Sequence, residues 1–332
     1  MLSAREFCVR DCGSTSEARK QRSGISQGCT LSPLLFIIVM TVLLHDAVDF
    51  LASSSETAYK KGDLSEVLFA DDTLLMGVSD VCLNDFLAAI YRAGLRYGME
   101  LHPTKFQLIS TDGHCKVYAP ESHTLVPVTD SMVYLGSILT ADSKAGRELS
   151  RRIGSAKADF DTLAKVWTHS SLTWSKKIRI YESLVESKLL YAMASCCLTR
   201  ADERRLDGFQ NRCLRKVLGI KTAYVSRVSN AAVLAKAKHQ SASAILRKRR
   251  FAILGKVLRA PPSHPLRMCC FVPNTLYPLN DFYVRRVGRP SKEWVKQMLT
   301  DALTLFGSME CACAHAANKL HWKSVVSEKL GY

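Results

Sequence analysis

Residues 65–77, SEVLFADDTLLMG, place two adjacent carboxylates between two short apolar runs. The flanking runs are apolar or β-prone and too short for a helix, so they predict two strands that meet at Asp71 and Asp72. An ionised carboxylate is costly to bury and two neighbouring carboxylates repel, so the pair requires solvent or a compensating charge. Two interpretations remain open from this segment alone: a hairpin tip that holds a metal ion, or a tight turn with two exposed aspartates.

Other patterns in the first 140 residues predict a mixture of helices and strands. The run LLFIIVMTVLL at 34–44 follows the helix-start signal Ser32-Pro33 and predicts a buried core helix, too short to span a bilayer. Apolar spacing predicts a second helix over 81–97. Strands are expected in three further segments, at 5–22 around Gly13, at 106–110 and at 132–139. These elements indicate an α+β fold with an antiparallel sheet.

From Arg147 onward the pattern changes to long amphipathic stretches with few strand signals. These stretches predict helices over four ranges, 147–168, 175–197, 201–218 and 228–258. The sequence APPSHP at 260–265 interrupts them, and a last helix is expected around 293–306, overlapping the basic loop RRVGRPSKEW at 285–294. The expected organisation has three parts: an α+β region over 1–140, a basic helical domain over 147–259, and a small helical C-terminal region over 260–332.

The charge of the chain is concentrated in its second half. Residues 1–150 contain 13 Lys and Arg against 18 Asp and Glu, whereas residues 151–332 contain 33 against 12, a net charge of +21. A surface this basic favours a polyanionic partner, with a merely soluble surface as the alternative. The chain is 47% hydrophobic, which is ordinary for a globular protein and argues against disorder.

Twelve cysteines raise the question of disulfides or a zinc site. Adjacent pairs such as Cys196-Cys197, and the lack of two facing C-x₂-C pairs, argue against both, and a cluster of Cys311, Cys313 and His315 is a weak alternative. No signal peptide is recognisable. We therefore expect a reduced intracellular protein with mostly free thiols and no membrane partner. A role on nucleic acid would be compatible with the nucleus, although no targeting signal is clear.

Four motifs follow one another along the first half of the chain. They are GISQGCTLSPLLF at 24–36, FADD at 69–72, GLRYGMELHPTKFQLI at 94–109 and YLG at 134–136. In this order and spacing they resemble the reverse transcriptases of non-LTR (LINE-type) retrotransposons, and FADD is similar to the family's [YF]-x-D-D hairpin. The segment at 189–220 and the sequence GRPSKEW resemble, more loosely, the family's thumb and C-terminal extension. The resemblance implies a partial polymerase palm followed by an all-α thumb-like domain.

The resemblance also implies an activity and a site. The family is an RNA-directed DNA polymerase that transfers nucleotides with two Mg²⁺ or Mn²⁺ ions, for which Asp71 is the stronger ligand and Asp72 a supporting one. Lys105 is implied near the departing pyrophosphate, with a solvated lysine as the alternative. Contacts to template and nucleotide are implied at Gly24, Gln27, Gly28, Ser32, Pro33, Phe69 and Ala70. The primer grip is implied at Tyr134, Leu135 and Gly136.

The implied partners are an RNA template, a DNA primer or RNA–DNA duplex, and dNTPs, while no protein partner is identifiable. The sequence departs from the family upstream of Gly24, where members carry a further catalytic aspartate and the fingers. Asp11, in VRDCGS, does not resemble that motif and lies too close to Gly24. The metal site then lacks a bridging carboxylate, so we expect a truncated member that is inactive alone. A catalytically dead nucleic-acid-binding protein that uses the basic helical half is the second hypothesis.

Overall fold

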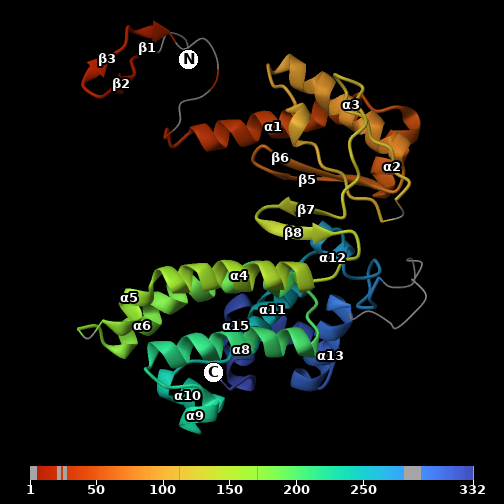
Figure 1. The fold of residues 1–332 in the computed structure, drawn as a ribbon. Coiled ribbons are helices and arrows are strands. Elements are labelled where there is room, and N and C mark those ends of the chain that lie inside the picture. The colour runs from red at the N-terminus through yellow and green to blue at the C-terminus, as the bar shows by residue number, and fades with distance from the viewer. Residues whose placement is uncertain are drawn as a thin grey trace. The chain divides into compact units, whose positions relative to one another are not determined.

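The structure is a computed structural model that describes residues 6–20, 24, 28–111, 113–169, 171–279 and 293–331. The chain divides into two compact units, coloured from red to yellow and from yellow-green to blue in Figure 1. The first unit contains residues 1–132 and 140–142, and the second contains residues 133–139 and 143–332. Helices and small antiparallel sheets together form the described part of the chain, in agreement with the predicted α+β class.

The first unit combines short hairpins with helices. In chain order it contains β1 (Glu6–Phe7), β2 (Arg10–Asp11), β3 (Ser14–Thr15), β4 (Arg19–Lys20), α1 (Ser32–Asp49), α2 (Ser53–Lys61), β5 (Leu64–Phe69), β6 (Asp72–Gly77), α3 (Asp80–Arg96) and the 3₁₀-helix η1 (Pro103–Lys105). β1 pairs with β4 and β2 with β3, both antiparallel, which confirms the short strands expected around Gly13. The hairpin of β7 (Ser131–Tyr134) and β8 (Ser137–Thr140), also expected, is divided between the two units.

The core of the first unit forms where α1, α2 and α3 pack with the β5–β6 hairpin. α3 buries Phe86, Ile90 and Ala93, whose spacing of three or four residues places them on one face. β5 contributes Leu64, which is 1% exposed. The predicted helix over 81–97 is therefore confirmed, because its apolar spacing matches the face that the rest of the unit covers.

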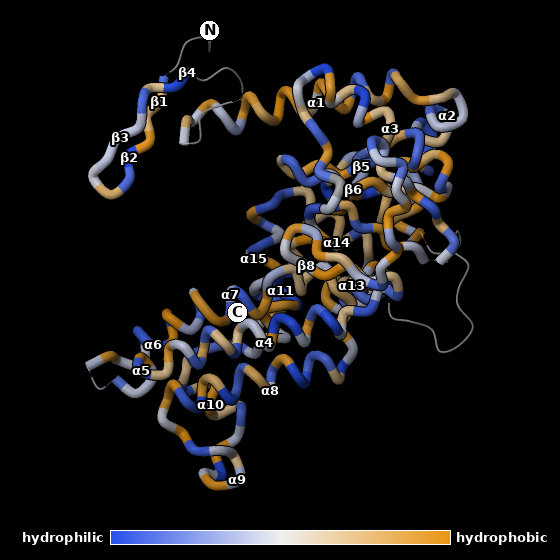
Figure 2. The backbone as a smooth tube through the Cα atoms, turned by 45° about the horizontal axis from the view of Figure 1, so that its top comes forward, coloured by the Kyte–Doolittle hydropathy of each residue, from blue (hydrophilic) through white to orange (hydrophobic). Residues whose placement is uncertain are grey.

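The helix predicted at 34–44 exists but is not the buried core helix that we expected. α1 buries Met40, Leu43, Leu44 and Ala47, while Ile37 and its apolar neighbours toward the helix start are half exposed. The apolar run continues around the helix (Figure 2), but only one face packs against α3. α1 has 18 residues, 28% of them buried, and by length and composition it is long and apolar enough to cross a membrane. Core helices of soluble proteins meet the same criteria.

The strand expected at 106–110 is also not formed. This segment makes a single parallel bridge, between Leu108 and Val128, and the N–H of Thr129 donates to the carbonyl of Leu108 at 2.8 Å. The alternating apolar residues are explained by packing instead, because Leu108 contacts the cluster that includes Val117 and Val126. Half-buried apolar residues can therefore cover a core from a loop without forming a strand.

Helices dominate the second unit. In chain order they are α4 (Gly146–Thr162), α5 (Ala164–Thr168), α6 (Trp174–Ile180), the π-helix η2 (Tyr181–Glu186), α7 (Ser187–Leu189), the 3₁₀-helix η3 (Met193–Ser195), α8 (Arg200–Val217), α9 (Ala223–Ser226), α10 (Asn230–Ala237), α11 (Ala242–Arg259), α12 (Pro265–Met268), α13 (Trp294–Phe306), α14 (Met309–Ala316) and α15 (Lys319–Lys329). The helical character predicted from Arg147 onward is confirmed.

Four of the predicted helical stretches differ from the observed helices. The stretch at 147–168 divides at Leu163 into α4 and α5. The stretch at 175–197 is interrupted by η2 and ends in η3 rather than continuing as one helix. The stretch at 228–258 divides at Lys238, whose φ of 50° ends α10, and Ser241 then caps α11 through the N–H of Ala244. The helix around 293–306 is not the last, because α14 and α15 follow it. Most of the basic loop at 285–294 lies outside the described residues.

One long helix joins two hydrophobic cores in the second unit. α4 and α8, which run side by side in Figure 1, pack with the first half of α11 through residues such as Leu149, Leu214 and Leu246. The second half of α11 buries Phe251 and Leu254 against α13, α14 and α15. A capping box begins α8, in which Thr199 and Asp202 bond to each other's backbone N–H groups.

Gly255 in α11 is packed against Trp322, so we expect an unusual effect of alanine there. A Cβ at Gly255 would lie 2.3 Å from Nε1 of Trp322, whose N–H donates to the carbonyl of Phe251. Alanine normally stabilises a helix interior by about 1 kcal/mol over glycine, but here we expect Gly255→Ala to lower the free energy of unfolding by about 1–3 kcal/mol through overpacking.

The matched control is Gly154→Ala in α4, where the added Cβ meets no atom within 4 Å. We expect this variant to raise the free energy of unfolding by about 0.5–1 kcal/mol. Chemical denaturation of the two variants measures the difference. Stabilisation by both substitutions would contradict the tight contact between α11 and Trp322.

Candidate functional site

The carboxylate pair lies at the tip of the β5–β6 hairpin, as the sequence predicts. Phe69 pairs with Asp72 in the antiparallel ladder, which leaves Ala70 and Asp71 as the two residues of the turn. Ala70 has a φ of 54°, in the left-handed region that costs a non-glycine residue about 1–2 kcal/mol. The whole tip from Phe69 to Asp72 is exposed. Solvent, rather than a buried counter-charge, therefore accommodates the two carboxylates in this structure.

An exposed tip of this kind offers hard oxygen ligands at a defined place. Asp71 and Asp72 suit divalent cations such as Mg²⁺ in their donor chemistry. Among the described residues, however, the two aspartates belong to no group of three His, Cys, Asp or Glu whose ligand atoms lie within 4.8 Å of one another. The oxygen ligands of Asp71 and Asp72 are therefore of the type that a divalent ion prefers. Two adjacent carboxylates, however, provide fewer ligands than a two-ion centre requires.

The residues implied to contact template and nucleotide lie partly outside the described structure. Gln27 is not among the described residues, so its contact with template and nucleotide stays a prediction. Gly24 and Gly28 are exposed, with φ values of 81° and 83°, a conformation that L side chains rarely adopt. Ser32 is buried at the start of α1, and Pro33 occupies the first turn, where its missing N–H costs nothing.

Lys105 is the last residue of η1 and its side chain is exposed. Its backbone N–H donates to the carbonyl of His102 at 3.0 Å, which closes the short 3₁₀ turn after the irregular segment that follows α3. The sequence placed this lysine at the start of a strand, and the absence of that strand leaves it on a turn. The assignment of Lys105 to the pyrophosphate remains a prediction.

The predicted primer-grip residues form the turn of the β7–β8 hairpin. Tyr134 ends β7, and Leu135 and Gly136 follow with φ values of 47° and 71°. Two consecutive left-handed residues define a tight two-residue hairpin turn, for which glycine at the second position is favourable. The backbone carbonyls of Leu135 and Gly136 accept hydrogen bonds from side chains of the second unit. This anchoring of the turn was not predicted from the sequence.

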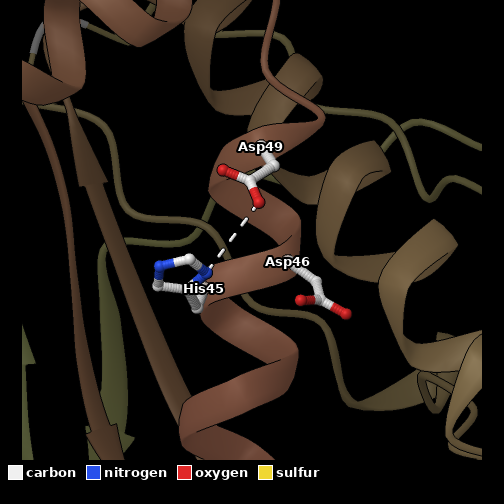
Figure 3. Close-up of side chains that lie close together, drawn as sticks. All are labelled: His45, Asp46 and Asp49. Atoms are coloured by element: carbon white, nitrogen blue, oxygen red, sulfur yellow. Dashed lines mark ion pairs between the residues drawn. The ribbon is translucent and has the colours of Figure 1, made fainter.

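Two further polar groups lie outside the hairpins. His45, Asp46 and Asp49 on α1 form the group of possible metal ligands found among the described residues (Figure 3). His45 and Asp49 are joined by an ion pair of 3.8 Å and their side chains are 79% and 69% exposed. Asp46 accepts a hydrogen bond from Tyr97 at 2.7 Å. Their i, i+4 spacing and exposure are typical of an ordinary helix surface pair.

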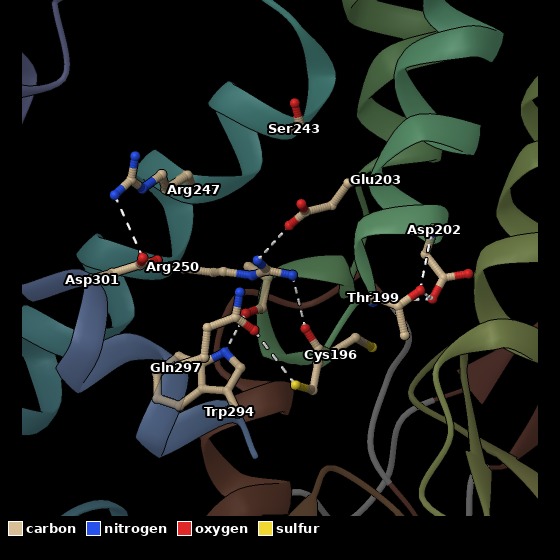
Figure 4. Close-up of polar contacts among 12 residues, drawn as sticks. Cys196, Thr199, Asp202, Glu203, Ser243, Arg247, Arg250, Trp294, Gln297 and Asp301 are labelled. Atoms are coloured by element: carbon tan, nitrogen blue, oxygen red, sulfur yellow. Dashed lines mark hydrogen bonds and ion pairs between the residues drawn. The ribbon is translucent and has the colours of Figure 1, made fainter. Parts of the chain in front are cut away.

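The second group surrounds a polar crevice of about 420 Å³ in the second unit (Figure 4). It is lined by Glu203, Ser243, Ala244, Arg247, Arg250, Gln297, Asp301 and Leu330. Arg250 donates to Glu203 at 3.4 Å and to the carbonyl of Cys196 at 3.1 Å, and Arg247 pairs with Asp301 at 3.5 Å. The Nε atoms of both arginines have no partner but are buried, so a ligand in the crevice would not reach them. These contacts join α8, α11 and α13 and have a structural role.

All twelve cysteines are free thiols, and the predicted alternative of a cluster at Cys311, Cys313 and His315 does not gather its ligand atoms in the described structure. His315 instead lies 2.8 Å from His321. The hydrogen bond from Cys270 lowers the pKa of the exposed Cys269 thiol to about 6.

Comparison with known proteins supports the sequence motifs. Residues 4–139, less than half of the chain, match the family described as "Reverse transcriptase (RNA-dependent DNA polymerase)". The chain is also 29% identical over 226 residues to the Retrovirus-related Pol polyprotein from type-1 retrotransposable element R2 of Popillia japonica. That similarity covers 62% of this chain and 29% of the relative, so the chain spans well under half of that polyprotein.

The hairpin with its two aspartates lies inside the matched segment, which defines residues 4–139 as a reverse transcriptase region. The similarity to the R2 polyprotein, which covers 62% of this chain, agrees with the resemblance to reverse transcriptases of non-LTR retrotransposons that the four motifs indicated.

Proposed function

We propose that this chain is part of an RNA-directed DNA polymerase of a retroelement, with Asp71 and Asp72 as metal-binding residues. The observation that carries the proposal is the hairpin tip, where Asp71 occupies the two-residue turn and Asp72 begins β6, both exposed and both within the reverse transcriptase match. Two bound Mg²⁺ or Mn²⁺ ions would supply activation of the primer hydroxyl and charge neutralisation on the triphosphate.

The other assigned residues would act around this tip. Phe69 and Ala70 would contact the template and nucleotide beside the metal ligands. Lys105 would donate a hydrogen bond to the departing pyrophosphate. The glycines at 24 and 28 would allow close backbone approach to the nucleotide, together with Gln27, Ser32 and Pro33. Tyr134, Leu135 and Gly136 would hold the primer strand. Expected substrates are an RNA template, a DNA primer and dNTPs.

The domain assignment belongs to the same proposal. Residues 1–140 would be the second half of a palm, residues 147–259 a basic thumb, and residues 260–332 a C-terminal extension. Support comes from the change from mixed hairpins and helices to helices after residue 140 and from the net charge of +21 after residue 150. The twelve free thiols support a reducing intracellular compartment.

Iron-directed cleavage tests the metal assignment without requiring polymerase activity. Fe²⁺ that occupies a Mg²⁺ site generates hydroxyl radicals, so with peroxide, a primer–template duplex and dNTP we expect backbone cleavage near residues 70–73. Excess Mg²⁺ should suppress it. The double variant Asp71→Asn, Asp72→Asn should lose at least about nine-tenths of this cleavage, because it removes both charged ligands.

The control is Glu100→Gln, which removes one exposed carboxylate of the same unit outside the hairpin. This variant should cleave like the unaltered chain. Equal cleavage at 70–73 in the double variant would show that the hairpin tip does not hold the ion. Binding of a duplex without any such cleavage would favour the second candidate, a nucleic-acid-binding protein without catalysis, which the charge of residues 151–332 supports.

A further inference from the structure

Side chains from α4 and from the turn after α7 bind the backbone of the β7–β8 turn. The guanidinium groups of Arg151 and Arg152, both on α4, donate to the carbonyl of Gly136. Tyr191, just after α7, donates its hydroxyl to the carbonyl of Leu135 at 2.8 Å. Both carbonyls of this left-handed turn are therefore bound by side chains that lie 15 to 56 residues further along the chain.

Glu148 orients the two arginines that bind the turn. Its carboxylate accepts from the N–H of Ile138 at 3.0 Å, from Arg151 at 2.9 and 2.8 Å, and from Arg152. The side chain is 2% exposed. Burial by itself would raise the pKa of Glu148, but the hydrogen bonds from Arg151, Ile138 and Arg152 outweigh it and hold the pKa below its ordinary value. A buried carboxylate with this many donors fixes the direction of the two guanidinium groups.

Arg152 is the central member of the group. Its guanidinium carbon lies 4.5 Å from the centroid of the Tyr191 ring, and its side chain is 9% exposed. It thus contacts the turn, Glu148 and the Tyr191 ring together, whereas Arg151 is 36% exposed at the edge. A buried charge that is paired, bonded to a carbonyl and stacked on an aromatic ring has little freedom to move.

The turn accordingly belongs to the second unit. Residues 133–139 cluster with the helices, although the neighbouring residues at 131–132 and 140–142 belong to the first unit. The hairpin thus crosses the unit boundary twice, and its tip is held on the helical side by Glu148, Arg152 and Tyr191.

We propose that Glu148, Arg152 and Tyr191 are positioning residues that make the 134–136 turn move as one body with the basic helices. The primer end would then be placed by the same unit that holds the duplex, because a rigid turn preserves the geometry of the bound strand. This inference rests on the proposed function, which assigns the turn to the primer strand.

The test uses the full chain, an RNA–DNA duplex, and a primer whose 3′-terminal nucleotide carries a photoreactive base. Tyr191→Phe is the main variant, because it removes the bond to Leu135 and keeps the ring under Arg152. Arg152→Ala is the stronger variant. We expect amide exchange of residues 135–138 to accelerate about tenfold in Tyr191→Phe, and crosslinks from the primer end to residues 134–136 to fall at least about fivefold.

The control is Arg147→Ala, an exposed arginine of α4 that removes the same charge as Arg152→Ala away from the turn. Duplex affinity of Arg152→Ala should equal that of this control, because the positioning effect is separate from charge. Rapid exchange with unchanged crosslinks would show that these side chains hold the turn without positioning the primer end, and would overturn the proposal. Unchanged exchange would overturn it directly. A wild-type chain that binds no duplex would overturn the proposed function together with this proposal. Amide exchange separates the two failures, because it measures the hold on the turn independently of duplex binding.

Discussion

The 332-residue chain, assayed alone, will extend a DNA primer on an RNA template several orders of magnitude more slowly than the same chain joined to the upstream part of an R2-type relative. Asp71 and Asp72 provide two neighbouring carboxylates, and no third ligand gathers with them among the described residues. Positioned metal ions and oriented substrates lower the barrier by about 7–11 kcal/mol, so an incomplete centre loses much of that effect. Primer extension with Mg²⁺ or Mn²⁺ measures the rates.

Asp71→Ala provides the control for this assay. It should abolish synthesis by the joined polypeptide and leave the slow background of the chain alone nearly unchanged. Glu100→Gln should alter neither. Robust synthesis by the chain alone that disappears in Asp71→Ala would contradict the prediction, and would mean that another carboxylate completes the centre.

Duplex binding by the chain will weaken steeply with salt. Residues 151–332 carry a net charge of +21, and each phosphate contact contributes about 0.9 to the slope of log affinity against log salt. With about six contacts, affinity for an RNA–DNA duplex should fall by about a thousandfold between 50 and 200 mM salt. Titrations at four or more salt concentrations give the slope. An affinity that is independent of salt would indicate that the charge serves solubility alone.

Basic residues on α8 allow the same prediction to be tested locally. Arg204, Arg212 and Lys216 are exposed on α8, with Arg212 eight residues after Arg204 and four before Lys216, so they lie on the solvent-exposed face of the helix. If this face contacts the duplex, Arg204→Ala and Arg212→Ala should each lower the slope by about 0.9. Lys61→Ala in α2 of the acidic first unit is the control and should leave the slope unchanged.

Local patterns predicted the elements whose determinants lie within a few residues. The β5–β6 hairpin followed from two short apolar runs around Asp71 and Asp72, and its register places these residues at the tip as expected. The helical character after Arg147 followed from amphipathic spacing. The strand predicted at 106–110 is not formed because the apolar residues around Leu108 pack on Val117 and Val126, and a short apolar run alone does not reveal whether a partner strand exists.

In the candidate site, too, the local features were predictable from the sequence and the long-range contacts were not. The two aspartates were identifiable because their carboxylates, the hairpin turn and the FADD motif lie in one short segment. The hydrogen bonds to the turn were not, although Glu148, Arg151 and Arg152 stand at helical spacing. The arginines bond to Gly136 and Glu148 bonds to Ile138, and both partners lie in another element. The only local signal was an acidic residue three and four positions before two arginines, which occurs on many solvated helices.

The sequence by itself determined the resemblance to reverse transcriptases, the carboxylate hairpin, the helical second half and the concentration of positive charge there. Each depends on residue type and spacing over short distances, where backbone conformation and periodicity act directly. Only the tertiary structure decided that α1 leaves much of its apolar surface exposed, and that Tyr191 bonds to Leu135 across 56 residues. Such outcomes depend on which faces meet after folding, and many pairings of apolar or polar faces are compatible with the same local pattern.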